Sequence, residues 1–314
     1  MTEDQLKRTR QTQQTDQPQK ARAQEFGTIG IWSGARGALR SEDPGRATEI
    51  AEAAAELDEL GYGTIWLGGK PGVAHAVPLL KATRRIRVAT GILSIWEHEP
   101  AAVAGQFVAV NTEYDNRFLL GVGVSHPHLA AQYSRPYSAI KEFLTGLDEA
   151  PVPVPAERRV LAALGPKMLE LSRDRAAGAH PYLVTVEHTG RARAILGDRA
   201  WLAPEHKAVL DTDLDRGRQT ARDYLAVYLP MPNYTNNLRR LGFADEDFEG
   251  GGSDRLIDAL FSIGDVDAVR KRTDEFLSAG ADHLALQVVT ADPLGAIPRR
   301  EWRLLAEALP LDGR

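Results

Sequence analysis

The chain has 314 residues, of which 43% are hydrophobic and 26% are charged, and its formal net charge is -5. These values are ordinary for a globular protein, and such mild acidity argues against a nucleic-acid-binding face, which needs clustered basic residues. The sequence contains no cysteine, which excludes disulfides, thiol nucleophiles and cysteine-ligated metals. The length fits two average domains or one large α/β domain.

Residues 1–25 are nearly free of large apolar side chains. Such a segment buries too little surface to offset its ordering entropy, so we expect a disordered tail followed by one domain over residues 26–314. A weakly basic arm that binds a partner is the alternative. No apolar run has the length of a transmembrane helix or the form of a secretory signal, and we therefore expect a cytoplasmic protein without membrane contact.

Strand-like and helix-like segments alternate in the first half of this domain. Apolar runs predict strands at residues 26–34, 63–69, 86–96 and 117–125. The first helix is expected to begin at Asp43-Pro44, a cap followed by a first-turn proline, and to end at Gly61. Further helices are expected at residues 74–85, 100–114 and 138–147.

The alternation continues after a proline-rich linker at residues 150–157. Strands are predicted at residues 158–164, 179–186, 206–213 and 282–289. Helices are predicted at residues 167–176, 188–196 and 300–309. A long, mostly helical stretch, residues 215–279, lies between the last two strands.

About eight strand–helix units with strands apolar on both faces predict a parallel α/β fold. A closed (β/α)8 TIM barrel with a helical insertion before the last strand is the leading expectation. The alternative is an open doubly wound sheet, whose dinucleotide fingerprint reads G-x-G-x-x-G. The nearest match is Gly121-Val122-Gly123, where His126 takes the place of the third glycine, which argues against that alternative.

The junction Gly165-Pro166-Lys167 lies between a predicted strand and a predicted helix. In a βα barrel the C-terminal ends of the strands build the active site. Proline in the first helical turn lacks an N–H group, and the other free amides, the helix dipole and Lys167 together predict an anion site. The alternative is that Gly165 and Pro166 only end the strand and begin the helix, without binding a ligand.

Four segments stand out by their order and spacing: "VATGILSIWEHEPAAVAGQF", "RFLLGVGVSHP", "ALGPKMLELS" and "GDVDAVRKRTDEFLSAGADHLALQ". In these segments the chain resembles the luciferase-like monooxygenase superfamily and, more closely, its actinobacterial branch of coenzyme F420-dependent oxidoreductases. The resemblance runs from about Phe26 to Val289. It implies a (β/α)8 barrel, commonly dimeric, that holds a deazaflavin, or FMN in sister groups, at the strand ends.

The resemblance also implies a cofactor site. "ATGIL" matches a bulge with a non-prolyl cis peptide bond, here Gly91–Ile92, that supports the middle ring, and Ser94 matches a nearby polar contact. "GVGVSHP" matches a loop that contacts the cofactor, and "GPKML" matches the loop that binds its phosphate. The implied cofactor-binding residues are Gly91, Ile92, Ser94, Gly123, Val124, Ser125, Gly165, Pro166, Lys167 and Met168.

The catalytic acid is less clearly marked. Sugar-phosphate dehydrogenases of the superfamily carry an Asp-His pair after the second strand, where this sequence has Gly68-Gly69-Lys70, which argues against that activity. Histidines are the candidates because their pKa lies near neutrality, and His126, in the fourth-strand loop, is the catalytic candidate.

Two other histidines are weaker candidates. His180 is expected to open the sixth strand, at the other end of the barrel, and His188 is expected beyond that strand's C-terminal end. The structural alternative for all three histidines is a hydrogen-bonded loop or cap residue. The pair His126 and His128 has no third ligand at a suitable spacing, so no metal site is expected.

Aromatic and amide side chains gather in the helical stretch before the last strand, where they either roof a pocket or belong to a kinked helix on the barrel rim: Tyr228, Met231, Asn233, Tyr234, Asn236 and Asn237. Trp32, Trp66 and Trp96 fall near strand ends, where they either wall an apolar pocket or pack in the core.

The sequence therefore favours an oxidoreductase that moves a hydride between coenzyme F420 and an unknown small organic substrate, as a homodimer according to the resemblance. One alternative keeps the fold but uses FMN and oxygen, which makes the chain a monooxygenase. The other is a barrel that binds a cofactor or metabolite without turnover.

Overall fold

The strands of the chain run parallel in one sheet. The computed structural model describes residues 25–34, 39–40, 43–126, 133–292 and 297–311. In these residues the sheet has 11 strands in the order β10-β9-β11-β1-β2-β3-β5-β6-β7-β8, with β4 paired to β5. The strands are β1 (Ile29–Ser33), β2 (Thr64–Leu67), β3 (Arg87–Thr90), β4 (Leu93–Ser94), β5 (Phe118–Gly123), β6 (Arg159–Leu161), β7 (Gly178–Ala179), β8 (Trp201–Leu202), β9 (Glu205–Val209), β10 (Phe261–Ile263) and β11 (Leu284–Val288).

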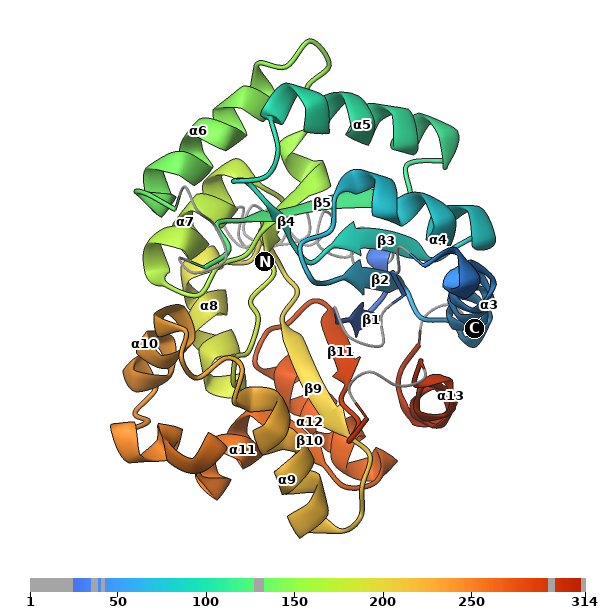
Figure 1. Cartoon of the computed structure of the whole chain (residues 1–314). Coiled ribbons are helices and arrows are strands. Elements are labelled where there is room, and N and C mark those ends of the chain that lie inside the picture. The colour runs from blue at the N-terminus through green and yellow to red at the C-terminus, as the bar shows by residue number, and fades with distance from the viewer. Residues whose placement is uncertain (1–24, 35–38, 41–42, 127–132, 293–296, 312–314) are drawn as a thin grey trace, which may run out of the picture.

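Helices alternate with these strands and surround them (Figure 1). The α-helices are α3 (Ala47–Leu60), α4 (Val77–Ala82), α5 (Pro100–Glu113), α6 (Pro136–Asp148), α7 (Pro166–Arg175), α8 (Val186–Leu196), α9 (Leu214–Leu225), α10 (Pro232–Arg240), α11 (Asp254–Leu260), α12 (Val266–Ser278) and α13 (Arg299–Ala308). Short 3-10 helices are η1 (Pro44–Arg46), η2 (Val73–Ala76), η4 (Ala156–Arg158) and η5 (Asp245–Gly251). Two predicted helix boundaries are confirmed. The helix α5 begins at Pro100, and the end of α3 is capped by Gly61, which has a left-handed φ of 92°.

Residues 201–209 close the sheet into a barrel. Between β8 and β9 lie only Ala203 and Pro204, and this segment bonds to a neighbour on each side. On one side the Ala203 amide donates to the Ala179 carbonyl at 2.9 Å, and on the other the Ala285 amide donates to the Pro204 carbonyl at 2.9 Å. The ring therefore runs through β1, β2, β3, β5, β6, β7, the joined β8–β9 and β11, and the predicted (β/α)8 barrel is confirmed.

The predicted insertion before the last strand is present. It contains α9, α10, α11 and α12, which Figure 1 shows in colours from gold (α9) to orange-red (α12) in the lower half of the view. The prediction of a mostly helical stretch is correct, but it missed β10, where Phe261 pairs with Lys207 of β9. A strand of three residues (Phe261–Ile263) between two helices carries too little period-two pattern to be recognised from sequence.

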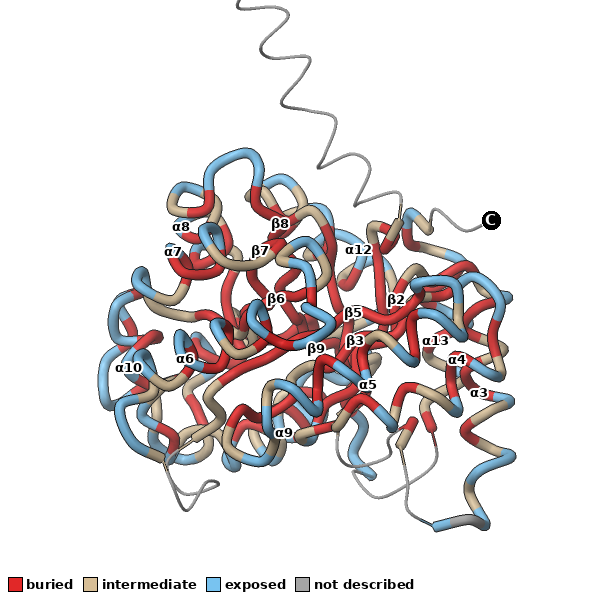
Figure 2. The backbone as a smooth tube through the Cα atoms, turned by 90° about the horizontal axis from the view of Figure 1, so that it is seen from above, coloured by how far each residue is buried: buried red, intermediate tan, exposed pale blue. Residues whose placement is uncertain are grey.

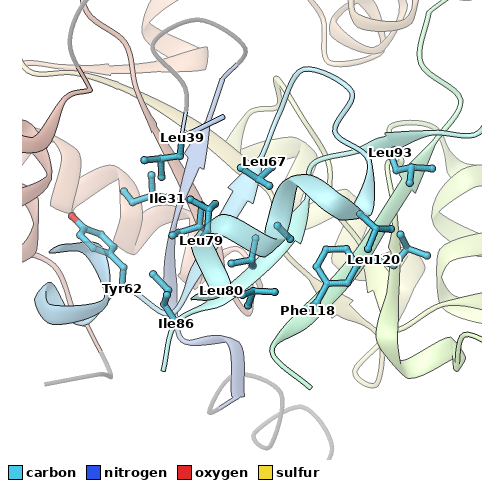
Figure 3. Packing of buried hydrophobic residues seen from close by; sticks show 14 of the residues in the cluster. Ile31, Leu39, Tyr62, Leu67, Leu79, Leu80, Ile86, Leu93, Phe118 and Leu120 are labelled. Atoms are coloured by element: carbon cyan, nitrogen blue, oxygen red, sulfur yellow. The ribbon is translucent and has the colours of Figure 1, made fainter. Parts of the chain in front are cut away.

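Buried residues, red in Figure 2, lie along the strands and on parts of the surrounding helices. Large and small residues alternate inside, where Trp66 and Trp201 are both 0% exposed beside alanines such as Ala89 and Ala285. Outside the strands, Leu79 and Leu80 of α4 pack among strand side chains (Figure 3). Each such leucine contributes about 1.5–3 kcal/mol through burial, so the helices fix the strand ends that form the site.

The predicted tail, residues 1–25, lies outside the described residues except for Glu25, whose carboxylate pairs with Arg158 at 2.5 Å. The extent of the single domain, residues 26–314, stays a prediction. No helix in the described part of the chain is both long and apolar enough to cross a lipid bilayer.

Candidate active site

The Gly91–Ile92 peptide bond is cis, at the position that the resemblance implied. This bond lies between β3 and β4, and Ser94 pairs with Gly123 of β5. A Cβ atom on Gly123 would lie 2.8 Å from Ile92 Cδ1 and 2.9 Å from Ala162 Cβ. The close packing excludes a side chain at Gly123 and brings the ends of β3, β5 and β6 together.

Three buried polar atoms beside this bond have no hydrogen-bond partner among the described residues: Trp32 Nε1, Ser94 Oγ and His180 Nε2. A Cβ atom on Gly91 would lie 2.8 Å from Trp32 Nε1 and 3.4 Å from His180 Nε2. Buried polar atoms are nearly always hydrogen-bonded in proteins. The approach of Trp32 Nε1 and His180 Nε2 to Gly91 therefore marks a place for a polar ligand group.

His180 does not lie where the sequence placed it. The sixth strand was predicted over residues 179–186, but β7 ends at Ala179, so His180 follows the strand and lies at the C-terminal end of the barrel. Its Nδ1 donates to the Ala203 carbonyl at 2.7 Å, which leaves Nε2 as an acceptor. Burial lowers the pKa of His180 to about 3, so the ring is neutral at physiological pH and is no proton donor there.

The predicted anion site lies at the start of α7. Gly165 is the N-cap residue and Pro166 is the first helical residue, as predicted. The Met168 amide already donates to the Gly165 carbonyl at 3.1 Å, so its N–H is less available than expected. The Lys167 side chain is exposed, and no described carboxylate pairs with it.

A second cation reaches the same helix terminus from α10. A Cβ atom on Gly165 would lie 3.5 Å from Arg240 Nη1. Arg240 is exposed and pairs with no carboxylate in the described part of the chain, while its carbonyl accepts a bond from Arg191 of α8 at 2.8 Å. The sequence analysis missed Arg240, because only the fold brings α10 beside α7.

The other histidines have different surroundings. His126 lies in the loop after β5, half-buried, with its ring 5.1 Å from that of Tyr234 on α10. His188 is 3% exposed, and its Nε2 bonds to the Leu164 carbonyl at 2.9 Å. Burial lowers the pKa of His188, and the bond fixes the backbone just before Gly165, so His188 holds the loop rather than reacting.

Two neighbours of His126 complete the fourth-strand loop. The Val124 carbonyl accepts a bond from Trp96 Nε1 at 2.5 Å. Ser125 has a left-handed φ of 55°, a conformation that few non-glycine residues adopt. His128 lies outside the described residues. Among the described residues, no group of three or more His, Asp or Glu side chains is arranged to hold a metal ion.

The segment Gly68-Gly69-Lys70 has a packing role. A Cβ atom on Gly68 would lie 2.3 Å from Trp32 Cη2, so glycine makes room for the indole ring. Lys70 Nζ pairs with the Glu97 carboxylate at 2.5 Å.

A buried polar cluster lies next to Trp32, and of its members the sequence analysis named only Tyr228. Lys207 and Glu205 of β9 form an ion pair at 2.6 Å, with side chains 1% and 0% exposed. Burial raises the pKa of the Glu205 carboxyl and lowers the pKa of the Lys207 ammonium. The Lys207 Nζ atom lies 4.0 Å from the centre of the Tyr182 ring, and that ring lies 4.8 Å from Trp32.

The hydroxyl groups of three tyrosines meet at one point in this cluster. The Tyr182 hydroxyl lies 2.7 Å from that of Tyr224 and 3.0 Å from that of Tyr228. Gln287 of β11 donates through Nε2 to the Tyr224 hydroxyl at 2.7 Å. The available signal was the spacing of Glu205 and Lys207 in "EHKAV", since two residues that lie two positions apart in a strand point to the same face.

A cavity of about 350 Å³ lies beside this cluster, at the C-terminal ends of β1 and β11. Its wall includes Trp32, Tyr224, Tyr228, Gln287 and Trp302 of α13. None of the residues predicted to bind the cofactor lines this cavity. The barrel mouth thus holds two neighbouring regions, the Gly91–Ile92 bulge and the cavity, and Trp32 contacts both.

The sequence matches a family model in its N-terminal part. Residues 28–150 match the family described as luciferase-like monooxygenase. A curated relative, 4-hydroxyprotoasukamycin monooxygenase of Streptomyces nodosus subsp. asukaensis, is 38% identical over 95 residues, which are 26% of this chain and 25% of the relative. The matched segment thus spans about a quarter of that relative's length.

Solved structures match over most of the chain. An F420-dependent secondary alcohol dehydrogenase in complex with an F420-acetone adduct gives a TM-score of 0.68 at 15% identity, over 90% of this chain and 98% of the other. The coenzyme F420-dependent tetrahydromethanopterin reductase of Methanopyrus kandleri gives 0.68 at 18% identity, over the same shares.

An FMN-bound monooxygenase shares the same fold. The oxygenating constituent of 3,6-diketocamphane monooxygenase of Pseudomonas putida gives a TM-score of 0.65 at 11% identity, over 90% of this chain and 100% of the other. At these identities the likeness establishes the fold alone. The family match over residues 28–150 and the barrel fold together confirm the predicted resemblance of this chain to the luciferase-like monooxygenases.

Proposed function

We propose that the chain is an oxidoreductase that binds coenzyme F420 at the C-terminal end of its barrel and serves hydride transfer between this deazaflavin and a small organic substrate. The observation that carries the proposal is the pair of buried polar atoms beside Gly91, Trp32 Nε1 and His180 Nε2, which have no hydrogen-bond partner among the described residues. Such atoms cost free energy unless a ligand completes them.

The residues beside Gly91 fit the polar edge of a deazaflavin or flavin ring. Trp32 Nε1 is a donor only, His180 Nε2 is an acceptor because Nδ1 carries the proton, and Ser94 Oγ can act as either. A ring edge with alternating carbonyl and N–H groups offers partners to all three. When bound, the cofactor supplies the hydride chemistry, and these side chains orient it.

We assign the cofactor's phosphate to Lys167 and Arg240 at the start of α7. Both are exposed cations without a described carboxylate partner, and a helix N-terminus adds favourable potential for an anion. We assign the proton step to His126, which lies on the loop after β5 and packs against Tyr234.

Two other functions remain as alternatives. An FMN-dependent monooxygenase is favoured by the curated relative and by the FMN-bound neighbour. A barrel that binds a cofactor or metabolite without turnover is favoured by the segment after β2, where the family's dehydrogenases have an Asp-His pair and this chain has Lys70 paired with Glu97. That reading predicts cofactor affinity with no reaction across a broad substrate panel.

Equilibrium titration of the purified chain with F420 and with FMN tests the proposal. We expect F420 to bind more tightly than FMN. Tighter binding of FMN supports the monooxygenase alternative, and no binding of either removes the cofactor claim.

A charge reversal, Lys167→Glu, tests the phosphate assignment. We expect at least a ~100-fold loss of F420 affinity, or about 2.7 kcal/mol, with unchanged circular dichroism, because a glutamate in the first helical turn is itself compatible with the helix dipole. Lys81→Glu, the same change at an exposed position of α4, is the matched control and should retain full affinity. Equal affinities of the two variants contradict the assignment.

We also propose, from the resemblance, that the chain forms a homodimer. Light scattering of the purified chain at micromolar concentration should give twice the monomer mass of 34.3 kDa. A monomer mass under these conditions removes this proposal and leaves the cofactor site unaffected.

A further inference from the structure

The cavity at the ends of β1 and β11 has a definite chemical character. Its wall combines apolar side chains, among them Trp32, Val289 and Trp302, with two tyrosines of the cluster, Tyr224 and Tyr228. Among the described residues that line it, the charged ones are Asp223 and Asp292, and none is Lys, Arg or His. The two carboxylates disfavour an anionic ligand. The volume of about 350 Å³ falls in the range of small-molecule sites.

The tyrosine cluster in its wall has fewer protons than oxygen–oxygen contacts. The hydroxyls of Tyr182, Tyr224 and Tyr228 lie within 2.7–3.0 Å of one another. Two of them also lie near Gln287 Oε1, at 3.2 Å from Tyr182 and 3.1 Å from Tyr224. These five contacts share three phenolic protons, so at least two contacts lack a proton at any moment.

The buried pair behind the cluster holds this arrangement in place. Lys207 Nζ lies over the Tyr182 ring at 4.0 Å and bonds to both carboxylate oxygens of Glu205, at 2.9 and 2.6 Å. Tyr182 is therefore fixed between a cation and Trp32. A fixed cluster with unused acceptor capacity is suited to accept a hydrogen bond from a ligand.

We infer that this cavity is a binding site for a neutral, largely apolar molecule with a hydroxyl group, an alcohol or a phenol, whose O–H donates to the oxygens of Tyr224 and Tyr228. This inference rests on the proposed function in one respect: the ligand is taken to be the substrate that meets the cofactor. Trp32 lies against Gly91 and also lines the cavity, so it forms the wall that the two sites share.

Binding of three naphthalene probes to the full chain, without any cofactor, tests the inference. The probes share a bicyclic ring: 2-naphthol has a neutral O–H donor, 2-methoxynaphthalene has the oxygen without the donor, and 2-naphthoate is an anion. We expect 2-naphthol to bind at least about ten-fold more tightly than either of the others in calorimetric titration. Equal affinity for 2-naphthol and 2-methoxynaphthalene overturns the inference.

Two variants assign the binding to the cavity. Tyr228→Phe removes one hydroxyl of the wall, and we expect it to reduce the preference for 2-naphthol over 2-methoxynaphthalene about ten-fold while leaving 2-methoxynaphthalene affinity unchanged. Tyr137→Phe, at an exposed tyrosine of α6 outside the cavity, is the matched control and should leave all three affinities unchanged. An unaltered preference in Tyr228→Phe refutes the tyrosine assignment.

The variant Val227→Trp tests whether 2-naphthol binds in this cavity, and it leaves the tyrosine cluster unchanged. Val227 lines the cavity and is 49% exposed, so a larger side chain there is compatible with folding. We expect it to abolish 2-naphthol binding by filling the cavity, and retained binding places the probe elsewhere. These titrations contain no cofactor, so their outcome is independent of F420 binding. The chain can bind F420 but not 2-naphthol, or bind 2-naphthol but not F420, and the two proposals are therefore tested separately.

Discussion

Two glycines of the barrel mouth sit where backbone and side chains approach too closely for any Cβ atom. At Gly91 the obstacle is Trp32, and at Gly123 it is Ile92 together with Ala162. Neither glycine has a positive φ, so the constraint is one of space and not of backbone conformation. The sequence placed both glycines in predicted strands and the resemblance implied that they bind the cofactor, but the packing that requires glycine at each position becomes visible only in the folded barrel.

Substituting Gly91 by alanine tests this packing. The new Cβ would lie 2.8 Å from Trp32 Nε1, so we expect a loss of about 1–3 kcal/mol in the free energy of unfolding and impaired F420 binding. Gly105→Ala, on an exposed face of α5 with no atom within 4 Å of the new Cβ, should instead stabilise the protein by about 0.5–1 kcal/mol. Urea denaturation of both variants checks the pair, and similar losses in both would contradict the steric account.

His180 makes stability depend on pH. Its pKa is about 3 in the folded protein, against an ordinary value near 6.5. Below pH ~6.5 the unfolded chain takes up a proton that the folded one excludes, so stability is complete above this pH and falls as the pH drops toward 3. Burial lowers the pKa of His188 and His206 in the same direction.

The variant His180→Phe keeps a ring beside Trp66, which stacks on His180 at 4.0 Å, and removes the titration. We expect its free energy of unfolding to fall less steeply between pH 6 and pH 4, by up to about 1.4 kcal/mol per pH unit. Denaturation curves at several pH values provide the measurement. A slope equal to that of the wild type would show that His180 is protonated in the folded state as readily as in the unfolded one.

At the scale of elements, β9 places charge inside the barrel. Alternation along the strand directs Glu205 and Lys207 inward to Tyr182, while His206 points outward and bonds to Ser262 of β10 at 2.7 Å. An isolated charge at such a position is costly, so the two side chains depend on each other.

Removing one partner of this pair should cost more than removing both. We expect Lys207→Met to lower the free energy of unfolding by about 3–5 kcal/mol, because Glu205 is left buried and unpaired. The double variant Glu205→Gln/Lys207→Met should recover part of this loss. The exposed pair of Arg270 and Asp267 on α12 is the control, since Arg270→Met should cost about 0.3–0.5 kcal/mol. A double variant no more stable than the single one would argue against coupling.

Element boundaries explain most differences between the sequence predictions and the structure. Helices with proline or glycine at their ends, such as α3 and α5, were predicted well because these residues act locally. The sixth strand was predicted too long, and this boundary error alone placed His180 at the wrong end. Arg240 and the tyrosine cluster depend on contacts between distant segments, and no local pattern reports such contacts.

At the scale of the whole molecule, closure of the barrel gathers the candidate residues at one end. The succession of parallel βα units, which the sequence showed plainly, places the ends of β3, β5 and β6 side by side. Motifs in the resemblance predicted the position of the cis bond and the start of α7. They did not predict the cavity, because residues of the insertion and of α13 form much of its wall.

The insertion has a hydrophobic cluster of its own, in which Leu225, Leu238 and Leu256 are each 0% exposed. It meets the barrel through Leu183, Val209 and Val289. Chain engineering can therefore treat residues 214–260 as a cassette for transplantation between related barrels. Such a chimera would exchange the cavity residues of the insertion together with the residue at position 240. We therefore expect its ligand preference and its cofactor affinity to change together.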